Sequence, residues 1–67
     1  MTELQKRLLG HLLQIANDGG FAMACDGAYR KPAHDLDRRG FAEWKGTSWG
    51  SSFWCITNVG RAALKDS

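Results

Sequence analysis

The sequence predicts a small α+β domain in which a helix, a short strand, a short helix, a two-stranded hairpin and a C-terminal helix follow one another. Three observations support this prediction: leucines recur at helical spacing near the N-terminus, Gly40 separates a short helical pattern from an alternating one, and Thr57 opens a second amphipathic pattern. The 67 residues suffice for a single domain over residues 1–67. A chain of this length buries too little surface to enclose a deep catalytic cavity.

The first predicted helix spans residue 3 to about residue 17. Thr2 and Gln5 fit a capping box, in which the side chain of each residue accepts a hydrogen bond from the backbone N–H of the other. Apolar residues then recur every three or four positions and predict one buried face, formed by Leu4, Leu8, Leu12, Ile15 and Ala16. Gly19 and Gly20 end this helix, because glycine readily adopts the left-handed conformation of a helix C-terminus.

The segment after the first helix is expected to hold a short strand and a short helix. Residues 21–25 form an apolar run before the turn signal Asp26-Gly27, which favours a third strand. A helix is placed from about Pro32 to Arg39, because proline suits a first helical turn but disfavours helical geometry at the residue before it. Its side that carries Ala33 and Leu36 is expected to face the core.

Two strands and a loop are expected to form a hairpin, here called the wing. Residues 41–45 alternate between apolar and charged side chains, and residues 53–56 form the second strand. The stretch from Lys45 to Ser52 is rich in glycine and serine and is expected to be a long loop. Trp49 is expected to be exposed at the loop tip. Trp44 and Trp54 are expected to pack inside.

The last predicted helix begins after the cap residue Thr57 and continues to about Lys65. Its buried side is expected to consist of three apolar residues, Val59, Ala63 and Leu64. Gly60 is expected to let this helix approach the sheet closely, because glycine has no side chain to keep two backbones apart.

The charge pattern permits nucleic-acid binding without singling it out. The formal net charge is +2, and the basic and acidic residues are spread along the chain with no basic arm or acidic tail. No run of about 18 apolar residues is present. We therefore expect a cytoplasmic protein with no membrane segment and no secretory signal. In that reducing compartment Cys25 and Cys55 are expected to be free thiols.

The sequence contains no convincing motif for catalysis or metal binding. Residues 46–50 match the G-x-S-x-G pattern of a nucleophile elbow, but that motif needs a helix after its serine and a histidine later in the chain. Here a strand is predicted next, and no histidine follows Ser48. The histidines and cysteines show no paired metal-ligand spacing. We expect no enzymatic activity, no cofactor and no metal.

Two stretches in the second half of the chain carry a family resemblance. Residues 36–44 read LDRRGFAEW, and residues 56–64 read ITNVGRAAL. Both resemble segments of the winged-helix family of small transcription regulators. The first resembles the end of the family's recognition helix and its first wing strand, and the second resembles the second wing strand and the closing helix. The resemblance as a whole covers roughly residues 33–65, about half of the chain. The resemblance implies a DNA-binding function. The chain departs from the family in leaving only residues 18–31 for a second helix, which is expected to be missing or reduced.

A DNA-binding module of this kind would contact double-stranded DNA with the basic side chains of its reader helix and wing. The candidates are Arg30, Lys31, His34 and Arg38 on the helix and Lys45 at the wing. Asp35 and Asp37 interleave with them, so the helix has a mixed charge. This hypothesis predicts an affinity that falls steeply as salt rises.

A second hypothesis keeps the same frame but gives it a protein partner instead of DNA. A protein-interaction adaptor or inhibitor module would dock through the short helix and the aromatic wing, with Trp49 and Arg39 among its contacts. A fold of this type serves both purposes, so the fold does not choose between them. Either module is compatible with a homodimer.

Overall fold

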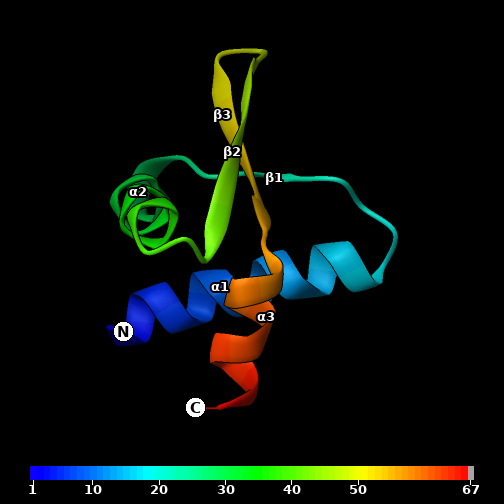
Figure 1. Cartoon of the computed structure of the whole chain (residues 1–67). Coiled ribbons are helices and arrows are strands. Elements are labelled where there is room, and N and C mark those ends of the chain that lie inside the picture. Colours follow the sequence, from blue (N-terminus) through cyan, green and yellow to red (C-terminus); the bar gives the residue numbers. More distant parts are fainter. Residues whose placement is uncertain (67) are drawn as a thin grey trace.

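The fold consists of three helices and a three-stranded antiparallel sheet, and the computed structural model describes residues 1–66. The elements are, in order, α1 (Glu3–Asn17), β1 (Met23–Ala24), a 3-10 turn (Gly27–Tyr29), α2 (Arg30–Arg38), β2 (Ala42–Ser48), β3 (Ser51–Ile56) and α3 (Asn58–Lys65). The strand order in the sheet is β1-β3-β2. Figure 1 shows α1 and α3 at the base, α2 beside the sheet, and the β2–β3 hairpin projecting away from the helices. The predicted α+β class and the predicted order of elements are confirmed.

Helix α1 begins and ends where the sequence predicts. Thr2 Oγ1 accepts a hydrogen bond from the Gln5 backbone N–H at 3.1 Å, and Gln5 Oε1 accepts one from the Thr2 N–H at 3.1 Å, so the capping box is formed. At the other end the N–H of Gly20 donates to the carbonyl of Ile15 at 2.8 Å. These two caps satisfy backbone groups that a helix of any sequence leaves without intrahelical partners.

The core lies between α1, α2 and the inner face of the sheet. Trp54, at the centre of β3, is its largest fully buried side chain, with 1% of its surface exposed. The other buried apolar residues are Leu8, Leu9 and Leu12 of α1, Ala33 and Leu36 of α2, Ala42 and Ile56 of the sheet, and Cys25. The prediction that the side of α2 with Ala33 and Leu36 faces the core is confirmed. On α1 the predicted face is confirmed for Leu8 and Leu12, with Ala16 packed against the core, whereas Leu4 and Ile15 are half-buried and the buried Leu9 lies outside the predicted face.

The segment between α1 and α2 contains a strand but no α-helix. β1 pairs antiparallel with β3, with Met23 opposite Trp54, which confirms the predicted third strand. The 3-10 turn is the only helical structure in residues 18–29, all of which the structure describes. The expectation that the helix between the first helix and the reader helix is missing or reduced is therefore confirmed. α2 then begins at Arg30, two residues before the predicted start at Pro32. The proline falls in the first turn, where a backbone N–H has no intrahelical partner to lose.

The strands of the hairpin are longer, and the turn between them is shorter, than predicted. β2 and β3 pair as far as Ser48 opposite Ser51, so only Trp49 and Gly50 form the turn. The expected long loop over residues 45–52 is therefore wrong. Both turn residues have positive φ, 54° for Trp49 and 76° for Gly50, as in the two-residue turns whose twist matches that of antiparallel strands. The hydroxyl residues beside the turn extend the strands instead of forming a loop.

Trp44 and Trp54 lie opposite each other on β2 and β3 but differ in burial. Trp54 is buried, whereas Trp44 has 53% of its surface exposed. The expectation that both pack inside is confirmed for Trp54 and wrong for Trp44. Because β3 is the central strand and β2 an edge strand, the helices cover the first indole and leave the second open. Residues directly opposite each other share one face of a sheet, so Trp44 lies on the face that α2 packs against.

Helix α3 begins after Thr57 as predicted, with the Thr57 hydroxyl oxygen accepting a hydrogen bond from the Gly60 N–H at 3.0 Å. Gly60 is buried, and a β-carbon on it would collide with the carbonyl oxygen of Phe41 and lie 3.0 Å from Ile56 Cγ1. The predicted close approach is confirmed. The prediction that Val59 is buried is wrong, because its exposed fraction is 57%. With Gly60 held inward, the neighbouring position turns toward solvent, since successive helical residues are about 100° apart.

Candidate nucleic-acid interface

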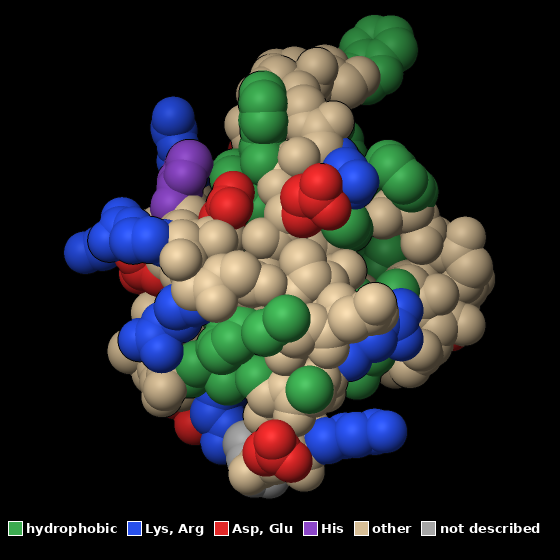
Figure 2. Space-filling view, viewed as in Figure 1, with side chains coloured by type: hydrophobic (Ala, Val, Ile, Leu, Met, Phe, Trp, Pro, Cys, Tyr) green, Lys and Arg blue, Asp and Glu red, His purple; other side chains and the backbone are tan. Residues whose placement is uncertain are grey.

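The exposed side of α2 gathers four basic or titratable side chains. Arg30, His34 and Arg38 recur every four residues, and Lys31 stands beside them, so all four lie on one side of the helix. All four are exposed, whereas Pro32, Ala33 and Leu36 on the opposite side are buried. We call this surface the basic face, made of Arg30, Lys31, His34 and Arg38. Figure 2 shows lysine or arginine side chains and a histidine grouped over α2, at the left of the molecule.

Asp37, at one side of the basic face, is bound to the scaffold. Its Oδ2 accepts a hydrogen bond from the indole Nε1 of Trp54 at 3.2 Å. A buried indole N–H needs an acceptor, because leaving a buried donor unpaired is unfavourable. Asp37 therefore holds the largest core side chain while it sits on the surface helix. In the sequence, Asp37 is recognisable only as a negative charge among positive ones.

Asp35, at the other side of the basic face, also makes a hydrogen bond to the rest of the fold. Its Oδ2 accepts a hydrogen bond from the side-chain amide of Gln5 at 3.3 Å, and Gln5 is itself 93% buried, with 7% of its surface exposed. Asp35 Oδ1 lies 4.0 Å from Arg38 Nη2, a distance at which an exposed ion pair contributes little. The two carboxylates thus flank the basic face and are directed toward α1 and β3 rather than standing within it.

Trp44 extends the basic face toward the hairpin, next to the indole of Trp54 on which His34 packs. The His34 ring packs edge-to-face on Trp54, with 5.0 Å between ring centroids and 79° between planes. Trp44 lies opposite Trp54 on the same face of the sheet. An exposed indole therefore follows the histidine along this side of the molecule. The exposure of Trp44 cannot be predicted from the sequence, because alternation along a strand shows which face a residue occupies but not how far the helices cover that face.

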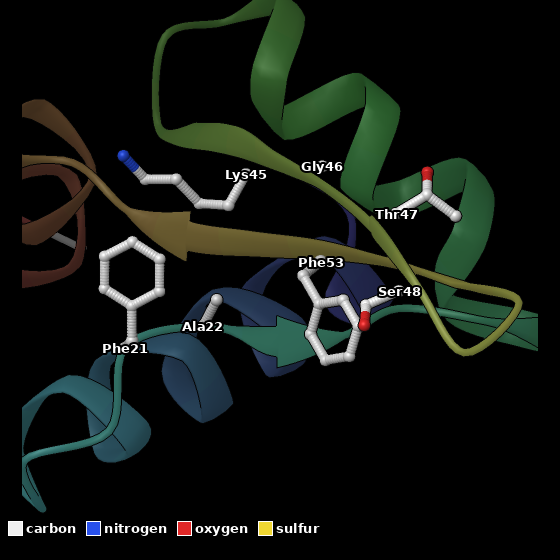
Figure 3. A pocket seen from close by; sticks show the side chains of 7 residues that line it. All are labelled: Phe21, Ala22, Lys45, Gly46, Thr47, Ser48 and Phe53. Carbon is white, nitrogen blue, oxygen red and sulfur yellow. The ribbon is translucent and has the colours of Figure 1, made fainter.

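Lys45 does not join the basic face. A β-bulge between Trp44 and Gly46 makes it the extra residue of β2. Its ammonium lies 5.4 Å from the centre of the Phe21 ring and 3.4 Å from Glu43 Oε2. Figure 3 shows the Lys45 side chain extending toward Phe21, on the side of the sheet where Phe53 also lies. The structure therefore separates this predicted contact from the four side chains of α2.

A shallow apolar groove of about 400 Å³ occupies the sheet face next to Lys45. Phe21, with 74% of its surface exposed, and the half-buried Phe53 stand at its sides (Figure 3). The groove is open to solvent and lies across the sheet from α2. It is a second surface with its own character, apolar where the basic face is charged.

The two predicted partner contacts lie far apart. Trp49 stands at the hairpin tip with 98% of its surface exposed, which confirms its predicted exposure. Arg39 follows α2 at the base of the hairpin, where it lines a polar cavity with Gln5, Asp35 and Arg38. The length of β2 separates Arg39 from Trp49, so the two side chains do not form one contact surface.

The cysteines are free thiols, as expected, and the surroundings of Cys25 are not those of a nucleophile. Cys25 is fully buried and its Sγ donates to the carbonyl of Met23 at 3.5 Å. Burial, with a smaller contribution from the charge of Asp26, raises the pKa of Cys25 to about 11. A reactive cysteine instead needs a lowered pKa. Within residues 1–66 no group of three or more histidine, cysteine or carboxylate side chains converges to hold a metal ion.

No protein-family model, curated protein or solved structure matches this chain. Among residues 1–66, no helix has the length and apolar character that crossing a bilayer requires.

Proposed function

We propose that this chain is a DNA-binding module of winged-helix type, a small cytoplasmic transcription regulator in which α2 is the reader helix and the β2–β3 hairpin is the wing. The observation that carries the proposal is the basic face. Four side chains suited to phosphates and base edges project from one side of an exposed helix. The two carboxylates of the same helix are held by Trp54 and Gln5, at the margins of that face.

The arrangement of elements supports the same proposal. A helix, a strand, a reader helix and a hairpin follow in the winged-helix order, and the first strand pairs with the second strand of the hairpin. In helix-turn-helix domains an additional helix crosses the phosphate backbone and positions the reader helix. Here a 3-10 turn stands in its place. We infer that the contacts of Asp37 and His34 with Trp54 position α2 instead.

The chemistry of the basic face fits duplex DNA. An arginine guanidinium can donate two hydrogen bonds to the O6 and N7 atoms of one guanine, and a lysine ammonium binds phosphate as a point charge. α2 has nine residues, so it is about 13 Å long. An α-helix with its side chains is about 10–12 Å in diameter, so α2 can lie in a major groove, which is about 12 Å wide.

The direct test is fluorescence anisotropy with a mixed-sequence duplex at low salt. We expect the wild-type chain to bind and the double variant Lys31→Ala/Arg38→Ala to lose at least tenfold in affinity, because two charged contacts are removed. The matched control removes the same charge from α3, as Arg61→Ala/Lys65→Ala, and should bind like the wild type. No anisotropy change at tens of micromolar wild-type protein would contradict the proposal.

The apolar groove favours a second candidate function, an adaptor or inhibitor module that docks a protein or a second copy of itself. Phe21 exposes most of its ring there, and exposed aromatic side chains are frequent anchors of protein interfaces. For a homodimer through this groove, sedimentation equilibrium should show self-association that Phe21→Ser abolishes and Trp49→Ala leaves unchanged. A wild-type chain that stays monomeric while it binds duplex DNA would favour the first function.

A further inference from the structure

The hairpin tip places a tryptophan where neither folding nor turn geometry favours one. Trp49 and Gly50 both have positive φ, and such turns prefer asparagine, aspartate or glycine at the position that Trp49 occupies. The left-handed conformation costs an L-residue with a large side chain stability that glycine or asparagine would retain. With 98% of its surface exposed, the indole recovers nothing by burial. A residue that is unfavourable for the fold on both counts points to a binding role.

The surroundings of Trp49 are neutral and rich in hydroxyl groups. Between Lys45 and Trp54 the chain has no charged side chain, and Thr47, Ser48, Ser51 and Ser52 flank the turn. Figure 2 shows a hydrophobic side chain standing off the end of the hairpin, well away from the charged side chains. Such a tip can lie against phosphates without electrostatic repulsion, and its hydroxyl groups can donate hydrogen bonds to phosphate oxygens.

The tip stands at a defined distance from the basic face. His34 packs on Trp54, and Trp54 lies opposite Trp44, so this pair marks the level of α2 along the hairpin. From Trp44 to Ser48, the last strand residue before Trp49, the chain advances by four strand residues, which corresponds to about 13 Å. A major groove is about 12 Å wide. A hairpin arm of this length is long enough for the indole to reach past the bordering phosphate strand when α2 lies in the major groove.

We propose that Trp49 is a wedge that inserts its indole between two base pairs of the duplex and kinks it. This inference rests on the proposed DNA-binding function, and it adds the class of DNA that is preferred: duplexes with a pyrimidine–purine step such as TA beside the site of α2. These steps unstack most easily, and apolar side chains that enter a base step bend the duplex. An indole stacks on any base, so the wedge selects for deformability rather than for a base edge.

The test combines affinity with DNA bending. A duplex that carries a donor and an acceptor dye at its ends is titrated with wild-type protein, Trp49→Ala and Trp49→Phe. We expect wild-type binding to shorten the end-to-end distance, Trp49→Ala to bind about tenfold more weakly without bending, and Trp49→Phe to keep most of both effects. A duplex whose TA steps are replaced should bend less. Phe21→Ala, which removes an exposed aromatic ring from the other face, is the matched control and should behave like the wild type.

The outcomes separate the two proposals. Binding and bending that are unchanged in Trp49→Ala would overturn the wedge, leave DNA binding by α2 intact, and leave the tip to a protein partner. Absence of duplex binding by the wild type would overturn the proposed function and the wedge together. If Trp49→Ala no longer bends the duplex but its weaker binding keeps the wild-type salt dependence, both proposals are supported. The indole carries no charge, so its removal should not change the salt dependence.

Discussion

The indole N–H of Trp54 donates a hydrogen bond to Oδ2 of Asp37 at 3.2 Å, and this contact joins the core to α2. Trp54 is fully buried at the centre of the sheet, whereas Asp37 lies on the exposed helix that carries the basic face. The His34 ring covers the same indole from α2. One core side chain is therefore held by two residues of α2, in a fold that has only a 3-10 turn between α1 and α2.

Replacing Asp37 tests this contact. Asp37→Ala should lower the free energy of unfolding by about 1–2 kcal/mol, because a buried donor loses its charged acceptor, and Asp37→Asn should lose less because its side-chain oxygen still accepts. Urea denaturation measures both values. Asp26→Ala serves as the control, since Asp26 is exposed and its side chain makes no cap hydrogen bond. If Asp37→Ala were as stable as the wild type, α2 would not be held through Trp54.

Two glycine-to-alanine substitutions should act in opposite directions. Gly60→Ala should destabilise the fold by about 3 kcal/mol or prevent folding, because the added methyl group meets the backbone carbonyl of Phe41, which cannot move freely. Gly10→Ala should stabilise it by about 0.5–1 kcal/mol, because no atom lies within 4 Å of the new methyl group and alanine favours the interior of α1. Thermal and urea unfolding distinguish the two. Equal effects of both variants would show that α3 does not approach Phe41 closely.

The geometry of the hairpin turn predicts how substitutions at Trp49 change the free energy of unfolding, independently of DNA. Trp49→Asn should raise the free energy of unfolding by up to about 1 kcal/mol, because asparagine tolerates the left-handed conformation. Trp49→Ala should leave it within about 0.5 kcal/mol of the wild type, because the indole is exposed and alanine keeps the unfavourable φ. A loss of more than about 1 kcal/mol in Trp49→Ala would mean that the indole packs on the fold.

Burial of Cys25 should make stability depend on alkaline pH. Its pKa is raised from 9.0 to about 11 in the folded chain, so the folded state holds the thiol proton at pH values where the unfolded state has released it. The contribution is therefore complete below pH 9 and is lost as the pH rises toward 11. Urea midpoints across this range should fall for the wild type and fall less for Cys25→Ala. Identical pH profiles for the two chains would rule out a buried thiol.

Local rules explain why much of the fold is predictable from the sequence. The capping box at Thr2, the glycine pair after α1 and the cap at Thr57 all act within a few residues, so their patterns mark helix ends directly. Burial at the edge of the sheet is different. Whether Trp44 is covered depends on where α2 ends relative to an edge strand, and no spacing along the chain carries that information.

The candidate site shows the same division. Helical spacing correctly grouped the four side chains of the basic face. The partners of Asp35 and Asp37 are far along the chain, 30 residues away in Gln5 and 17 residues away in Trp54, so their hydrogen bonds could not be inferred from a pattern. The predicted long loop is wrong because glycine and serine are typical of loops, whereas here the strands continue until a turn that begins with a tryptophan at positive φ.

The central claim is that the basic face of α2 binds duplex DNA, and the dependence of affinity on salt tests it most directly. Each phosphate contact contributes about −0.9 to the slope of log affinity against log salt concentration. We predict that Lys31→Ala/Arg38→Ala makes this slope shallower by about two, whereas Arg61→Ala/Lys65→Ala leaves it unchanged. A slope that is the same in the wild type and in Lys31→Ala/Arg38→Ala, or that falls equally in both double variants, would contradict the claim.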